Sequence, residues 1–126
     1  MLLAPDPQRL DEELPKLFAD GISSCKLYMT YDALKLRDGE LLDVMLATRK
    51  HQFTTMIHAE NGEVVEWMTK KLEERGMTEP YHHYTSRPPI VEAEATNRAI
   101  SLSEIIQIPI LLVHVSAPVY QFPKTG

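Results

Sequence analysis

The chain has 126 residues, of which 44% are hydrophobic and 25% are charged, and this composition excludes a disordered tail or a fibrous repeat. The formal net charge is -5 and the basic residues are scattered, so we expect neither a nucleic-acid partner nor binding to an anionic membrane surface. No apolar run approaches the roughly 20 residues that a membrane span needs. Cys25 is the single cysteine and the first residues are too briefly apolar for a signal peptide, which favours a cytoplasmic protein.

Apolar residues recur at helical or strand spacing along most of the chain. In chain order, the pattern predicts a helix over residues 7–19, a strand over 24–29, a helix from about 38 to 50, a strand over 54–59, a helix from about 62 to 75, a loop over 77–89, a helix from about 89 to 107 and a strand over 110–115. Strands that alternate with helices are typical of a parallel sheet. We therefore expect one α/β domain whose strands are covered by helices on at least one face.

The same periodicity indicates which helical side chains are buried. The expected buried positions are Leu41, Leu42, Met45 and Leu46 in the helix that begins near residue 38, and Val64, Val65, Trp67, Met68 and Leu72 in the helix that begins near residue 62. These residues are expected to pack against the sheet.

Each of the three predicted strands carries one unusual residue within it or at its end: Lys26, His58 and His114. In parallel α/β proteins the carboxyl ends of the strands face the ligand. A buried lysine must lose its charge, pair or be chemically changed, and its neutral amine can take up carbon dioxide as an anionic carbamate. Two neutral imidazoles are nitrogen ligands of the kind that zinc favours. The three residues are therefore candidates for a metal site.

Structural roles are the alternatives for each of these residues. A histidine at a strand end is often a hydrogen-bonded structural residue, and Lys26 can extend its amine outward from an apolar strand. The adjacent pair His82 and His83 is a weaker metal candidate, because neighbouring side chains in an extended loop point apart. Cys25 adjoins Lys26 but is expected to be a small buried thiol.

Four segments of the sequence carry a resemblance to a known family. They are Gly-Ile-Ser-Ser-Cys-Lys-Leu-Tyr-Met-Thr-Tyr at 21–31, Ile-His-Ala-Glu-Asn-Gly-Glu at 57–63, and Ser-Arg-Pro-Pro at 86–89 with the following helix and Val-His-Val at 113–115. Over residues 10–116 the chain resembles dihydropyrimidinases and D-hydantoinases, which are cyclic amidohydrolases. The resemblance implies a partial TIM-type (β/α)8 barrel, with about three parallel strands and flanking helices.

The resemblance also implies an activity and roles for individual residues. In the family, a cyclic amide or imide is opened by a metal-activated hydroxide at a centre of two metals, usually zinc. By position, Lys26 resembles the carboxylated lysine that bridges the metals, and His58 and His114 resemble the two histidines that hold the second metal. Tyr31 resembles the tyrosine that hydrogen-bonds the developing oxyanion.

Four further residues lie close to these blocks. Glu60 and Asn61 follow His58 and either orient its ring or cap the next helix. Arg87 and Glu92 flank a helix start and are expected to form a structural ion pair rather than to bind substrate.

The chain lacks other parts of the family's pattern. A full barrel takes roughly 250 residues, so residues 1–126 are expected to be a fragment of the catalytic barrel domain. No His-x-His occurs in the sequence, and the family's late aspartate has no counterpart. Residues 117–126 contain two prolines and diverge from the family, for which a premature end or an altered reading of the gene is our hypothesis.

Three functions remain open at this point. The first is an impaired metal-dependent hydrolase of cyclic amides, and the second is a catalytically inactive barrel fragment or interaction module. The third is a single-metal site made of His58, His114 and a water molecule. Because an open three-stranded sheet exposes two edges, we also expect the chain to self-associate as a homo-oligomer.

Overall fold

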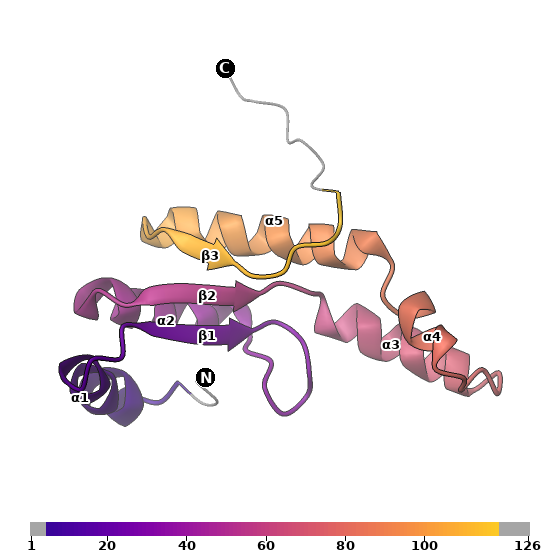
Figure 1. Ribbon diagram of the computed structural model, residues 1–126, viewed down its shortest axis with the longest axis horizontal. Coiled ribbons are helices and arrows are strands. Elements are labelled where there is room, and N and C mark those ends of the chain that lie inside the picture. Colours follow the sequence, from indigo (N-terminus) through magenta and orange to yellow (C-terminus); the bar gives the residue numbers. More distant parts are fainter. Residues whose placement is uncertain (1–4, 119–126) are drawn as a thin grey trace, which may run out of the picture.

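The computed structural model describes residues 5–118, in which strands and helices alternate along the chain (Figure 1). The elements are the π-helical turn η1 (Arg9–Glu13), α1 (Leu14–Ala19), β1 (Ser24–Tyr28), α2 (Asp38–His51), β2 (Thr54–His58), α3 (Gly62–Glu73), α4 (Tyr81–Thr85), α5 (Pro89–Ile106) and β3 (Ile110–Leu112). The predictions for the first four residues and for most of the divergent tail lie outside the described residues.

The sheet has the order β1-β2-β3, and both pairs of neighbouring strands are parallel. The predicted α/β fold with three parallel strands is therefore confirmed, and within residues 5–118 the sheet is open rather than closed into a barrel. The register places Lys26 beside Met56 and Tyr28 beside His58, while Met56 also pairs with Leu111. Because side chains alternate along a strand, these five residues lie on one face of the sheet.

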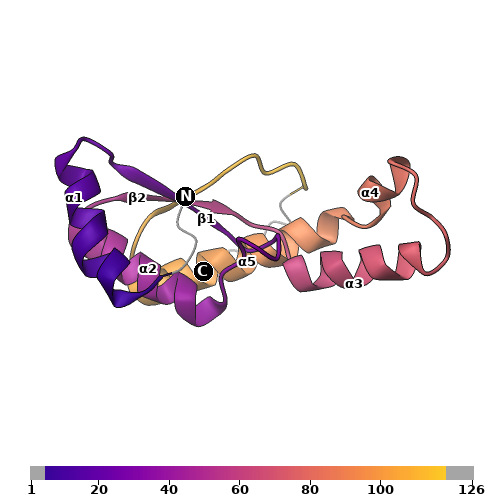
Figure 2. The same ribbon diagram turned by 90° about the horizontal axis from the view of Figure 1, so that it is seen from below.

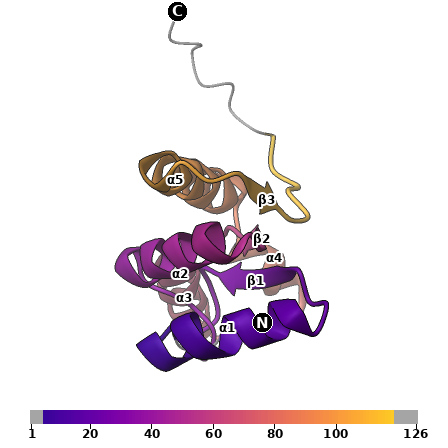
Figure 3. The same ribbon diagram turned by 90° about the vertical axis from the view of Figure 1, so that its left-hand side faces the viewer.

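The opposite face of the sheet is covered by helices (Figure 2). Seen from the end of the molecule, α2 and α5 lie next to each other beside the strands (Figure 3). Leu27 and Ile57 point to this side and are fully buried, as are Leu41 and Met45 of α2. The prediction that helices cover at least one face is therefore confirmed.

A short hydrogen-bond chain joins the central strand to α2. The hydroxyl of Thr55 donates to the hydroxyl of Thr48 at 2.8 Å, which donates in turn to the carbonyl of Met45 at 3.0 Å. Both threonines are fully buried. Their polar atoms are thereby paired inside an otherwise apolar layer, which removes the cost of burying them alone.

The structure corrects two predicted boundaries. The loop expected over residues 77–89 contains the short helix α4, and β3 ends at Leu112 instead of reaching Val115. The backbone of His114 has φ 38°, which is left-handed and incompatible with an extended strand. The third strand therefore cannot continue through His114.

The structure also corrects several positions that were expected to be buried. Leu46 of α2 is 51% exposed, and in α3 Trp67 is 61% exposed and Val64 is 39% exposed. Figure 2 shows the reason for α3, which extends with α4 beyond the end of the sheet. Most of α3 therefore lies past the strands, although Val65 is buried at the start of the helix. No helix among the described residues is long and apolar enough to span a bilayer.

Cys25 is buried on the helix-covered face of β1, as expected for a structural thiol. Burial raises the pKa of the Cys25 thiol from 9.0 to about 11, so at pH 8 about one thiol in a thousand is ionised. We predict that an aromatic disulfide reagent reacts with the native chain far more slowly than with the chain in denaturant, measured by absorbance at pH 8. Equal rates in the two conditions would contradict the burial of this side chain.

Candidate metal centre

The three candidate ligands come from the three strands of the sheet. Lys26 lies within β1, His58 is the last residue of β2, and His114 follows the end of β3 by two residues. The ring centroids of His58 and His114 are 4.5 Å apart, and the rings meet edge to face. The Nζ atom of Lys26 lies 5.1 Å from the ring centroid of Tyr28, which stacks on His58 at 5.5 Å. The fold thus gathers the amine and both imidazoles around the carboxyl end of β2.

Tyr31 also contacts this group from the loop after β1. Its ring centroid lies 5.4 Å from that of His58, in an edge-on arrangement. The backbone of Tyr31 has φ 68°, a left-handed conformation that costs a residue with a side chain about 1–3 kcal/mol. Gln52 and Gln107 share such a conformation, but both end helices, where it is ordinary. Tyr31 and His114 do not end helices, so their left-handed backbone conformations indicate a constrained site.

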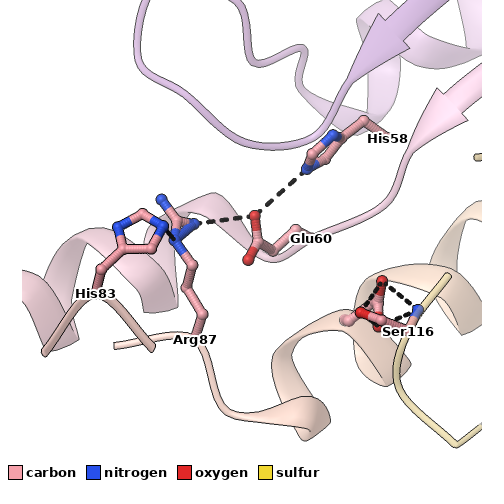
Figure 4. Close-up of polar contacts among 6 residues, drawn as sticks. His58, Glu60, His83, Arg87 and Ser116 are labelled. Carbon is pink, nitrogen blue, oxygen red and sulfur yellow. Dashed lines mark hydrogen bonds and ion pairs between the residues drawn. The ribbon is translucent and has the colours of Figure 1, made fainter. Parts of the chain in front are cut away.

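Glu60 lies beside the ring of His58 in the segment between β2 and α3 (Figure 4). Its Oε2 atom is 3.4 Å from Nε2 of His58 and 3.1 Å from Nη1 of Arg87. Asn61 instead caps α3, because its Oδ1 atom accepts a hydrogen bond from the backbone N–H of Val64 at 3.2 Å. Of the two roles considered for this pair, Glu60 contacts the histidine and Asn61 caps the helix.

The surroundings of His58 favour a neutral imidazole. Burial lowers the pKa of His58 below its ordinary value, and the electrostatic influence of the neighbouring His114 and Lys26 acts in the same direction. The hydrogen bond to Glu60 opposes this shift in pKa without reversing it. A neutral ring is the form that binds a metal ion.

The ion pair expected between Arg87 and Glu92 is replaced by two separate contacts. Arg87 pairs with Glu60. The carboxylate of Glu92 accepts hydrogen bonds from the backbone N–H of Ser116 at 3.1 Å and from that of Ala117. Glu92 thereby fastens α5 to the segment directly after His114.

The histidine pair at residues 82 and 83 lies on α4 rather than in an extended loop. His83 accepts a hydrogen bond through Nε2 from Nε of Arg87 at 3.1 Å (Figure 4). His83 is therefore connected to the candidate centre through Arg87.

Tyr28 is a member of the centre that the sequence reasoning missed. It lies under the ring of His58 and next to the amine of Lys26. The signal was its position two residues after Lys26 in the same strand, because this spacing puts both side chains on one face.

Comparison with known proteins identifies the segment, although no family model matches the chain. The D-hydantoinase of Geobacillus stearothermophilus is 43% identical over 107 residues, which are 83% of this chain and 23% of that protein. The dihydropyrimidinase of Arabidopsis thaliana is 41% identical over 96 residues, or 75% of this chain and 18% of that protein. A solved D-hydantoinase structure superposes with a TM-score of 0.89 at 39% identity, over 94% of this chain and 26% of that structure.

The chain is homologous to part of a hydantoinase. The resemblance to dihydropyrimidinases and D-hydantoinases that the sequence motifs indicated is therefore confirmed. The chain spans about a quarter of the length of the relatives it matches, with 23% for the first three D-hydantoinases. Its three parallel strands and their helices correspond to part of the hydantoinase fold.

The donor atoms in this hydantoinase-like segment can be compared with what a metal ion needs. Among residues 5–118, no group of three or more histidine, cysteine, aspartate or glutamate side chains could hold a metal ion. Two imidazoles in contact do suit zinc, which binds through nitrogen and takes four ligands. The residues present therefore fit zinc as part of its ligand shell.

Proposed function

We propose that this chain carries part of the zinc centre of a hydrolase that opens cyclic amides or imides, such as dihydropyrimidines or hydantoins. The observation that supports it best is the 4.5 Å contact between the rings of His58 and His114, which come from different strand ends. Further support comes from the relatives named D-hydantoinase and dihydropyrimidinase.

Each candidate residue has one role in this proposal. His58 and His114 hold zinc through ring nitrogens, and Lys26 supplies a further ligand once its amine has added to carbon dioxide and lost a proton. The chemistry that zinc supplies when bound is the polarisation of the ring carbonyl and the activation of water. Tyr31 donates a hydrogen bond from its phenol to the oxygen on which negative charge develops.

Catalysis by this chain alone is impaired in our proposal. The sequence contains no His-x-His to hold a first metal, and a carbamate on Lys26 needs two metal ions to be held firmly. Residues 1–126 then act as a segment of a catalytic barrel domain, with a small cyclic molecule as ligand and a cytoplasmic location.

The test is zinc stoichiometry and hydantoin opening by the purified chain. We expect zinc binding that His58→Ala and His114→Ala abolish, and slow ring opening that Lys26→Ala abolishes. His51→Ala is a matched control, because His51 ends α2 and lies outside the centre. Ring opening that survives Lys26→Ala would refute the assigned mechanism.

A catalytically silent interaction module is the second candidate. It is favoured by the lack of a three-residue metal group within residues 5–118 and by the exposed Leu111 on the uncovered face of the sheet. Such a module would bind no zinc, would leave hydantoin intact and would elute as an oligomer in gel filtration, because open sheet edges pair with other strands.

A further inference from the structure

A chain of three side chains leads from α4 and α5 to the candidate ligand His58. The guanidinium of Arg87 contacts the carboxylate of Glu60 at 3.1 Å, and the same oxygen lies 3.4 Å from Nε2 of His58 (Figure 4). The three side chains are only 13% to 21% exposed, so water competes weakly for these contacts. The arrangement is more sheltered than an ordinary surface ion pair.

We propose that Arg87 is a positioning residue, which acts through Glu60 to select the ring tautomer and orientation of His58. This inference rests on the proposed function, because it concerns how His58 presents a nitrogen to zinc. A carboxylate paired with a guanidinium accepts hydrogen bonds, so this contact favours the tautomer in which the ring nitrogen facing Glu60 carries the proton. Nε2 is the ring nitrogen that lies 3.4 Å from Glu60. In our proposal it carries the proton, and Nδ1 keeps the lone pair that would bind a metal ion.

Arg87 makes two further contacts, with His83 and with Tyr31. Its Nε atom donates to Nε2 of His83 on α4 at 3.1 Å, and its guanidinium carbon lies 5.8 Å from the ring centroid of Tyr31. A cation at this distance from an aromatic ring is attracted to the face of the ring. Arg87 thus connects α4 with both His58 and Tyr31, and its loss would loosen two candidate site residues together.

The tautomer of His58 can be measured without metal or substrate. Long-range ¹H–¹⁵N NMR spectra of the full chain at pH 8 distinguish the protonated ring nitrogen, with His58→Asn used to assign the signals. We expect the Nε2-protonated form in the parent and a mixture of both tautomers in Arg87→Gln. In calorimetry we expect Arg87→Gln to weaken zinc binding about tenfold. This is the lower end of the range seen when the hydrogen-bond partners of metal ligands are removed.

Two further variants separate positioning from general support of the fold. Arg87→Lys keeps a cation beside Glu60, so it should recover the parent tautomer and most of the zinc affinity. Arg98→Gln removes a partly buried arginine that pairs with Asp38 and Glu94 away from the candidate centre. It should change neither the tautomer of His58 nor the zinc affinity.

The outcomes distinguish this inference from the proposed function. A parent that binds no zinc refutes the function in this chain, and the tautomer in Arg87→Gln then decides the inference. If Arg87→Gln changes neither the zinc affinity nor the tautomer of His58, the inference is refuted and the proposed function is unaffected. If circular dichroism shows that Arg87→Gln does not fold, Glu60→Ala takes its place, and an unaltered His58 tautomer there overturns the proposal.

Discussion

Leu41→Ala is expected to lower the free energy of unfolding by about 2–5 kcal/mol, the range measured for leucine in closely packed cores. Leu41 is fully buried in α2, within the core cluster that also contains Leu27 and Ile57 of the sheet. Alanine removes apolar contacts and leaves a cavity between the helix and the strands, which neighbouring side chains refill only in part. Urea denaturation followed by circular dichroism measures the loss.

Leu46→Ala is the matched control in the same helix. Leu46 is 51% exposed, so its truncation removes little buried area and should change the free energy of unfolding by less than about 0.5 kcal/mol. Similar losses for Leu41→Ala and Leu46→Ala would contradict the described orientation of α2.

Gly62→Ala is expected to destabilise the fold by about 1–3 kcal/mol, as overpacking does in tight sites. A Cβ atom at this first residue of α3 would lie 2.9 Å from the carbonyl oxygen of Met29 and 2.9 Å from Cα of Thr30. Both are backbone atoms, so relief requires the segment after β1 to move. That segment carries Tyr31, and the substitution should also alter the near-ultraviolet circular dichroism of the tyrosines.

Gly39→Ala provides the control for Gly62→Ala. Gly39 lies in the first turn of α2, and an added Cβ there meets nothing within 4 Å. Alanine restricts the unfolded chain, so we expect a gain of about 0.4–1 kcal/mol in the free energy of unfolding. Urea denaturation of both variants provides the comparison, and a loss of equal size in both would show that close packing at Gly62 is not the cause.

Periodicity predicted the architecture because helices and strands of this chain each bury one side. It located β1, β2, α2 and α5 to within a few residues. Periodicity mispredicted burial where the burial of a helix depends on which element packs against it. The pattern of α3 is apolar, yet Trp67 is 61% exposed, because the helix extends past the sheet. Local pattern carries no information about where a sheet stops.

The candidate centre was predicted in part for a similar reason. Lys26, His58 and His114 stand out because each is unusual in an apolar strand, and the parallel order of the strands brings their ends together. The contact between Glu60 and Arg87 joins residues from separate connections, so no spacing in the sequence indicates it.

The position of β2 decides in which order the candidate centre would come apart. His58 stands at the end of β2, the only described strand with a neighbouring strand on both sides, whereas Lys26 lies in the border strand β1 and His114 follows the border strand β3. Local opening begins where backbone hydrogen bonds are fewest. If either border strand opened, we expect one candidate ligand to move away while His58 and Glu60 keep their positions.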